Sequence, residues 1–236
     1  MKSSGRIGLL ILALPIAYLT MCSTYYAAEP IRATVIDAET GQPIEGVVVV
    51  AHWELEGGLE GGSNMGQVKV LESITDENGI LNFPAWGPKR VSSGILSNTR
   101  LKDKDPGLLF FKSSYKYLSI QNNKGLEKTA SKGPIVRTSI WNGKKIKLKK
   151  FRGTISEYAD EIDHFTSDLY VLVSQGSECE WRSIPLTIAA LGRLEIIYKS
   201  ANLDRGTFYN YLIWNDEGYI KKGCGSTKKF IMEHEQ

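Results

Sequence analysis

The stretch from Ile31 to Ala51 constrains the fold of this chain more than any other. It reads IRATVIDAETGQPIEGVVVVA, and its two apolar arms are rich in β-branched residues, which suit a pleated sheet surface and disfavour a helix. Between the arms, Asp37 can bond its own following backbone, Gly41 tolerates positive φ, and Pro43 presets φ for a turn. The stretch therefore predicts two strands joined as a hairpin.

A second turn signal lies further along the chain, at Thr75–Gly79. Its Asn78-Gly79 pair favours a tight turn between strands, and Leu81 and Phe83 after it alternate as in a strand with one buried face. We expect a second hairpin here. The Gly-rich segment from Gly57 to Asn64 predicts a mobile loop.

Two motifs in these turns carry a family resemblance. V-x-D-x-x-T-G-x-P-I-x-G-V spans 35–47 and T-D-x-x-G-x-L-x-F spans 75–83, and together they resemble the carboxypeptidase regulatory-like domain. Over residues 30–151, Tyr115-Lys116 and Ile146-Lys147-Leu148 match later strands of the family, although Ser114 stands where the family usually has Gly. The resemblance implies an antiparallel, prealbumin-type β-sandwich. The family is an interaction and structural module, so the resemblance indicates a fold more than a function.

Residues 1–28 have the features of an export leader. Lys2 and Arg6 precede an apolar run over residues 7–21, which fits a secretory signal and is short for a bilayer span of ~20 residues. Leu19-Thr20-Met21-Cys22 resembles a bacterial lipobox, so Cys22 is a candidate for lipidation. We expect an exported protein of the periplasm or outer membrane. Cleavage near Ala27-Ala28 without a lipid, or an uncleaved membrane anchor, are the alternatives.

The remaining cysteines, Cys179 and Cys224, form an even pair in a chain expected in an oxidising compartment. We predict a disulfide between them. Two separate buried thiols are the alternative. A metal site is disfavoured because neither cysteine has a CxxC partner.

The hydrophobic period becomes helical after Arg152. Thr154 and Glu157 have capping-box spacing, and Pro185 suits the first turn of a second helix. Apolar residues then recur at helical spacing, at Tyr158, Ile162, Phe165, Leu169 and Leu172, and at Ile188, Leu191, Leu194 and Ile197. We therefore predict an α+β chain: a leader over 1–28, the β-sandwich over 29–152, and a small helical-hairpin region over 153–236.

Charge is unevenly distributed along the chain. Lys and Arg number 17 against 3 Asp and Glu over residues 84–152, whereas the preceding segment, 29–83, has 2 against 10. One interpretation is an anion-binding face with Lys144, Lys145 and Lys147 as its candidate residues. The other is that acidic and basic segments pair within the fold, and that the alternating lysines mark an edge strand with one wet face. The segment concerned contains Arg100, Lys102, Lys104, Lys144, Lys145, Lys147, Lys149 and Lys150.

The sequence does not predict an enzyme. It contains no H-E-x-x-H, H-x-x-E or G-x-S-x-G motif, so we predict no catalytic residues, no metal site and no cofactor. The opening stretch also resembles the hydroxyisourate hydrolases, but Thr34 stands where that family has a catalytic histidine. His164, with acidic neighbours on the first predicted helix, is more typical of a solvated helix face than of a metal site.

Two functions remain as hypotheses. The first is an exported, non-catalytic envelope protein whose β-sandwich serves as an interaction or structural module for an envelope protein or polysaccharide partner. Attachment to a membrane would run through Cys22, and an exported chain has no nucleic-acid partner. The alternative is a glycan-binding accessory module that uses aromatic stacking platforms, namely Trp53, Trp86, Trp141, Tyr115 and Tyr117.

Overall fold

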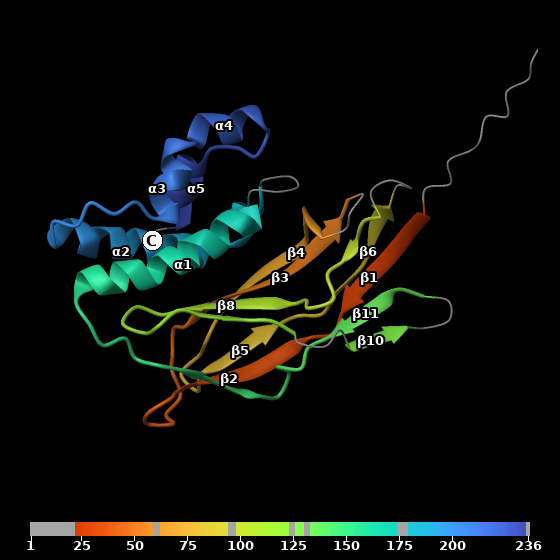
Figure 1. Ribbon diagram of the computed structural model, residues 1–236, viewed down its shortest axis with the longest axis horizontal. Coiled ribbons are helices and arrows are strands. Elements are labelled where there is room, and N and C mark those ends of the chain that lie inside the picture. The colour runs from red at the N-terminus through yellow and green to blue at the C-terminus, as the bar shows by residue number, and fades with distance from the viewer. Residues whose placement is uncertain are drawn as a thin grey trace, which may run out of the picture.

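The chain is a mixed α+β protein in which strands come first and helices follow (Figure 1). The computed structural model describes residues 22–58, 62–93, 98–122, 126–129, 133–173 and 179–234, with only the backbone described for residues 22 and 126–129. None of the helices in these ranges is long and apolar enough to cross a membrane.

The strands within the described ranges form three sheets. Their bounds are β1 (Cys22–Ala28), β2 (Ile31–Asp37), β3 (Val48–Gly57), β4 (Ser63–Ile74), β5 (Ile80–Phe83), β6 (Trp86–Ser93), β7 (Arg100–Leu101), β8 (Gly107–Phe111), β9 (Leu118–Ile120), β10 (Leu126–Thr129), β11 (Ile135–Thr138) and β12 (Lys145–Leu148). The orders are β10-β11-β1-β6, β12-β2-β5 and β4-β3-β8-β9, with β7 also paired to β3. β1 pairs with β11 in parallel, and β12 pairs with β2 in parallel. The prediction that all strands pair antiparallel is therefore wrong.

The predicted opening hairpin is wrong in its pairing. β2 pairs with β12 and β5, whereas β3 pairs with β4, β7 and β8 in a different sheet. The turn residues do fold the chain back on itself, since Ile36 and Pro43 form an isolated bridge, but the chain then crosses between sheets. Four consecutive residues, Val47 to Val50, are all buried, and such a strand needs cover on both faces.

The second turn is also a crossing rather than a hairpin. Asp76 accepts hydrogen bonds from the backbone of Asn78 and Ile80, and Gly79 has φ +68°, so the local turn forms as expected. However, β4 before it pairs with β3, and β5 after it pairs with β2.

Thr75 links the two segments in which the chain passes from one sheet to another. Its hydroxyl donates to the carbonyl of Ile44 at 2.6 Å and accepts from the amide of Val47 at 2.9 Å. At Gly79 an added Cβ would lie 2.4 Å from the carbonyl oxygen of Val35, so only glycine fits there.

The two ends of the segment 57–64, which was predicted to be a mobile loop, belong to the paired strands β3 and β4. Glu56 pairs with Asn64 and Gly57 with Ser63. Residues 59–61 lie outside the described ranges, so the predicted mobility of the loop is untested.

The central sheet has a different core on each face. One face, which includes Val49 and Phe110, packs against β1, β2, β5 and β12. Alternate residues on the other face pack against the helices, and these are Val48, Val50, Val70, Leu109 and Phe111. Period-two alternation along β3 and β8 thus builds two cores from one sheet.

The helices after residue 153 lie against the outer face of the central sheet (Figure 1). Their bounds are α1 (Ile155–Val173), the 3₁₀ turn η1 (Glu180–Ser183), α2 (Pro185–Ser200), α3 (Phe208–Trp214), α4 (Asp216–Lys221) and α5 (Thr227–His234). The capping box is confirmed: the Thr154 amide donates to Glu157 at 2.7 Å, and the Glu157 amide donates to the Thr154 hydroxyl at 3.2 Å. The Phe165 ring stacks on Phe111, with centroids 5.1 Å apart.

Candidate functional site

The three candidate lysines lie at the edge of a sheet, on and beside β12. Lys145 and Lys147 point to solvent, while Ile146 and Leu148 between and after them are buried, as the alternation predicted. Lys144 precedes the strand and is exposed. Among the described residues, none of the three makes a salt bridge.

The exposed face of this sheet extends the basic strip across β2. Lys145 pairs with Thr34 and Lys147 with Ile36, and exposed Arg32 lies two residues earlier on the same face of β2. Arg32 is opposite Asn82 of β5, so no acidic residue is in register with it. Three cations from two neighbouring strands therefore share one face.

Other basic residues of the same segment pair with acidic residues of the preceding one. Arg100 contacts Glu56 at 2.6 Å, and Lys102 contacts Glu54 at 3.2 Å. Lys150 lies 3.8 Å from the buried carboxylate of Asp37. The structure thus separates two sets that the sequence could not distinguish: residues that neutralise the acidic segment, and Lys144, Lys145 and Lys147, which do not.

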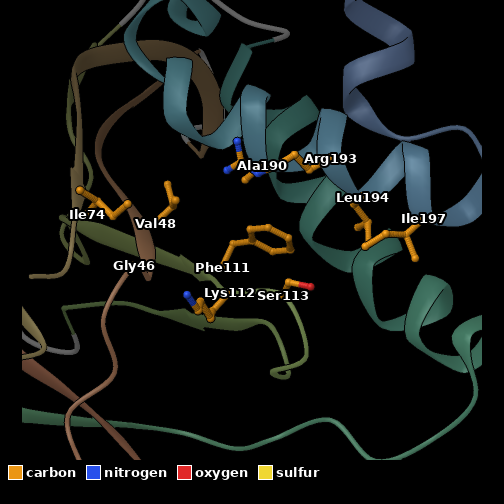
Figure 2. A pocket seen from close by; sticks show the side chains of 10 residues that line it. All are labelled: Gly46, Val48, Ile74, Phe111, Lys112, Ser113, Ala190, Arg193, Leu194 and Ile197. Atoms are coloured by element: carbon orange, nitrogen blue, oxygen red, sulfur yellow. The ribbon is translucent and has the colours of Figure 1, made fainter. Parts of the chain in front are cut away.

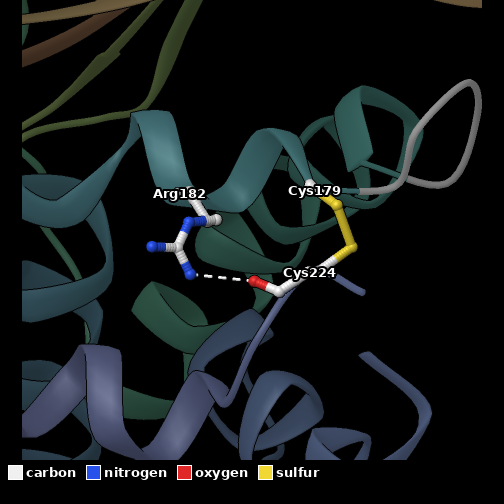
Figure 3. The surroundings of a disulfide bond; sticks show 3 residues. All are labelled: Cys179, Arg182 and Cys224. Atoms are coloured by element: carbon white, nitrogen blue, oxygen red, sulfur yellow. Dashed lines mark hydrogen bonds between the residues drawn. A yellow bond between two sulfur atoms is a disulfide. The ribbon is translucent and has the colours of Figure 1, made fainter. Parts of the chain in front are cut away.

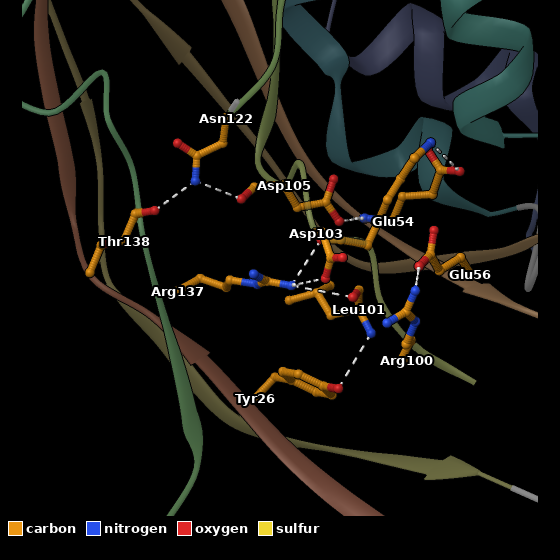
Figure 4. Close-up of polar contacts among 11 residues, drawn as sticks. Tyr26, Glu54, Glu56, Arg100, Leu101, Asp103, Asp105, Asn122, Arg137 and Thr138 are labelled. Carbon is orange, nitrogen blue, oxygen red and sulfur yellow. Dashed lines mark hydrogen bonds and ion pairs between the residues drawn. The ribbon is translucent and has the colours of Figure 1, made fainter. Parts of the chain in front are cut away.

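A buried polar network lies between β3, β8 and β11 (Figure 4). The amide of Glu54 donates to the Asp105 carboxylate at 2.6 Å, and Nη2 of Arg137 donates to the carbonyls of Leu101 and Lys102. Asn122 donates to two carbonyls, those of Asp105 and Thr138. Burial raises the pKa of Asp105 to about 8, against the opposing effect of the Glu54 amide. The sequence contained no signal for this network, because its members come from four segments.

Cys179 and Cys224 are joined by a disulfide, which is the predicted pair (Figure 3). The bond connects the residue before η1 with the segment between α4 and α5. Beside it, Nη1 of Arg182 donates to the Cys224 carbonyl at 2.8 Å, and its guanidinium lies 5.4 Å from the Trp181 ring centroid.

Cys22, the lipidation candidate, is the first residue of β1, and its side chain is not among those described. Residues 1–21 of the predicted leader lie outside the described ranges as well. Residues 22–28, which the sequence analysis placed in the leader, pair with β6 and β11, and Tyr26 and Ala28 are buried. Residues 22–28 are therefore part of the folded β region, although the sequence analysis placed them in the leader.

The aromatic residues considered for glycan stacking are engaged within the fold. Trp53 is 1% exposed and meets Trp86 edge to face. Trp141 donates to the carbonyl of Gln121, while the hydroxyls of Tyr115 and Tyr117 donate to Asp37 and Asp168. The most exposed aromatic side chain among the described residues is instead Trp214, on α3, which the sequence analysis did not single out; Tyr25 of β1 is also exposed.

The acidic residues near His164 have a structural partner. Arg205 contacts Asp160 at 2.6 Å and Asp163 at 3.0 Å. Within the described residues, no three His, Cys, Asp or Glu side chains gather in a way that could hold a metal ion.

A groove that sequence reasoning missed runs between α2 and the central sheet (Figure 2). Its volume is about 270 Å³, just below the roughly 300–1,000 Å³ that is usual for ligand pockets. Two cations line it, Lys112 after β8 and Arg193 on α2. They are 81 positions apart in the sequence, so no local motif could have indicated them.

Comparisons with known proteins give little further guidance. No protein-family model matches the chain, and no curated protein is significantly similar to it. The solved structures that match include the crystal structure of 3-chlorocatechol 1,2-dioxygenase from Rhodococcus opacus 1CP. That match has 13% identity and a TM-score of 0.27, and it covers 56% of this chain and 62% of the dioxygenase chain.

This comparison corrects the expectation that the chain is not an enzyme. The protein matched is an enzyme, so similarity cannot be used to exclude catalysis. At this identity and TM-score the likeness is also too weak to transfer an activity to this chain. We therefore assign neither an activity nor its absence.

Proposed function

We propose that this is an exported protein of the bacterial envelope whose β region is a carboxypeptidase regulatory-like, prealbumin-type β-sandwich acting as an interaction module. The two motif turns support this proposal, since both form as local turns and both carry the chain between packed sheets. The core shared by β2, β3, β5 and β8 supports it too, because a sandwich encloses its core between facing sheets.

The partner we propose is an acidic envelope polysaccharide, bound at the basic face of Arg32, Lys145 and Lys147 together with the exposed Lys144 that precedes β12. The observation that carries this proposal is the separation of charges: Arg100, Lys102 and Lys150 pair with acidic residues, and Lys144, Lys145 and Lys147 do not. Exposed cations repeated along a strand suit a repeating anionic polymer, because each charge can meet a successive acidic group.

The test is retention on an immobilised acidic polysaccharide. Replacing Lys144, Lys145 and Lys147 by Gln is expected to lower the salt concentration needed for elution, because the attraction between exposed charges is screened with a Debye length of about 8 Å at physiological salt. The matched control replaces Lys199, Lys221 and Lys228, which are exposed in the helical region and carry the same total charge. Equal retention of the two triple variants, or no retention of the unmodified protein, would refute the proposed site.

We propose further that the mature protein begins at Cys22 and is anchored there by a lipid. Support comes from β1, because cleavage after Ala28 would remove a strand whose Tyr26 and Ala28 are buried. Cys22→Ala is expected to move the protein from the membrane to the soluble periplasmic fraction, since a single-residue anchor is lost. A mature N-terminus beyond Cys22, or unchanged fractionation of the variant, would contradict this.

A further inference from the structure

The groove along α2 combines an apolar wall with a charged end. Its sheet side is formed by the ends of β3, β4 and β8 and its helix side by one face of α2 (Figure 2). A second hollow of about 310 Å³ adjoins it, and the two share Ser113, Leu194 and Ile197. The lining residues of the first groove are Gly46, Val48, Ile74, Phe111, Lys112, Ser113, Ala190, Arg193, Leu194 and Ile197.

The two cations lie on opposite walls of the groove, Lys112 on the sheet side and Arg193 on the side of α2. In Figure 2 the side chains of Lys112 and Arg193 reach toward the end formed by Gly46 and Val48, while Leu194 and Ile197 lie at the other. No acidic residue lines either hollow, and neither cation makes a salt bridge with the described residues. An anion bound between them would meet no competing carboxylate in the lining.

The second hollow is apolar where it continues from Leu194 and Ile197. Phe151, Ile155 and Tyr158 form its apolar wall, and Ser113, Ser114, Gly153 and Thr154 complete the lining. The Tyr158 hydroxyl is already engaged, accepting from the Ser114 amide at 3.2 Å and donating to the Lys112 carbonyl at 3.4 Å. This wall therefore favours hydrocarbon over a polar ligand group.

Ile197 indicates that the groove is not simply unfilled core. The helical period placed Ile197 on the buried face of α2 with Leu194, yet it is 43% exposed whereas Leu194 is 2% exposed. Ile74, at the opposite end of the groove, is 49% exposed. Apolar side chains thus remain open to solvent at both ends of a hollow whose charged end carries two cations.

We propose that this groove binds a single-chain fatty-acid carboxylate. The carboxylate lies between Lys112 and Arg193, and the hydrocarbon chain follows Leu194 and Ile197 into the second hollow. The combination of charges and apolar wall selects this class: the cations recognise the carboxylate head, and the apolar wall favours burial of the hydrocarbon chain. This site is distinct from the basic face on β12, so the two proposals fail or hold separately.

The experiment is calorimetric titration of the purified protein with decanoate, decanol and acetate. Decanoate is expected to bind at least about tenfold more tightly than either comparison ligand, because decanol has no carboxylate to pair with the cations and acetate lacks the hydrocarbon chain. Lys112→Gln with Arg193→Gln is expected to weaken decanoate binding by a similar factor. Lys199→Gln, on the same helix but outside the groove, is the matched control and should leave binding unchanged.

A second variant protects the test against loss of folding in the first. Ile197→Glu places a negative charge at a half-exposed position between the two hollows, and it should abolish decanoate binding without altering the circular dichroism spectrum. The proposal is overturned if decanol binds as tightly as decanoate, or if the double Gln variant binds decanoate normally. It is likewise overturned if the protein binds phosphatidylglycerol vesicles through these residues but not monomeric decanoate.

Discussion

Asp37 and Asp105 are both buried carboxyls, yet their surroundings shift their pKa values in opposite directions. Asp37 accepts from the backbone amides of Thr40 and Glu39, each at 2.9 Å, and these bonds lower its pKa to about 2. Asp105 accepts one short bond from the Glu54 amide, but burial dominates and raises its pKa to about 8. Hydrogen bonds to the charged form therefore dominate at one site, and desolvation dominates at the other.

The first prediction concerns Asp105 and pH. Because its pKa is raised from 3.8 to about 8 on folding, the native state holds a proton that the unfolded chain releases. This group's contribution to the unfolding free energy is complete below about pH 4 and falls as pH rises toward 8, by up to about 1.4 kcal/mol per pH unit. Asp105→Asn, which stays neutral, should remove that slope in denaturant titrations between pH 5 and 8.

The control for this prediction is Asp37→Asn, whose effect has the opposite sign. The lowered pKa of Asp37 stabilises the fold above the unfolded pKa, and that contribution disappears as pH falls toward 2. The Asn variant should therefore lose stability at neutral pH while keeping the slope between pH 5 and 8. An unchanged slope in Asp105→Asn would contradict our account of the buried network.

At the scale of elements, the docking of α2 on the sheet depends on Glu72 of β4. Its carboxylate accepts from the amides of Leu186 and Thr187, each at 2.7 Å, and from the Thr187 hydroxyl at 2.6 Å. α2 begins at Pro185 and has no side-chain cap of its own, so a strand residue more than a hundred positions earlier provides the cap. The same hydrogen bonds therefore cap the N-terminus of α2 and hold the helix against β4.

We expect Glu72→Ala to destabilise the protein by about 1–3 kcal/mol, because it leaves helix N-terminal donors without an acceptor. Equilibrium denaturation in urea would measure the loss, and Glu77→Ala, at an exposed turn position, is the matched control. Comparable stability of the two variants would show that solvent replaces the cap without cost. Binding of decanoate should also weaken in Glu72→Ala, since α2 supplies one wall of the groove.

At the scale of the whole molecule, the central sheet links two cores that neither region completes alone. Val48 and Val49 are adjacent on β3, but their side chains belong to different cores. Val48 packs in the core between the central sheet and the helices, and Val49 packs in the core between the central sheet and the other strands. The helical region thus shares its core with the sheet. The disulfide ties η1 to the segment between α4 and α5, within this covering layer.

Truncation after Arg152 should therefore leave a β region that does not remain a folded monomer. The cut would expose the outer face of the sheet, including Val50, Leu109 and Phe111, and large apolar patches promote aggregation. Size-exclusion chromatography and dye binding to exposed apolar surface would measure the effect. A soluble, cooperatively unfolding fragment 22–152 would contradict the shared core. In that case the region at 153–236 would be a separable attachment.

The sequence alone determined the local features of this protein: where helices begin, which strand residues are buried, and which cysteines pair. The capping box at Thr154, Pro185 in the first turn of α2, the alternation along β12 and the pairing of the two late cysteines all depend on residues whose effect is local or on simple parity. The turns at Asp37 and Asp76 also formed as predicted.

Only the tertiary structure decided which strands pair and which charges remain free. The same turn chemistry serves a hairpin and a crossing between packed sheets, so the turn residues could not assign β2 and β3 to different sheets. Likewise, the lysines near β12 and the cations at 100 and 102 look alike in sequence, and only the folded chain brings acidic partners to the latter. The groove of Lys112 and Arg193 exists because α2 docks on the sheet, and docking depends on contacts between residues far apart in the chain.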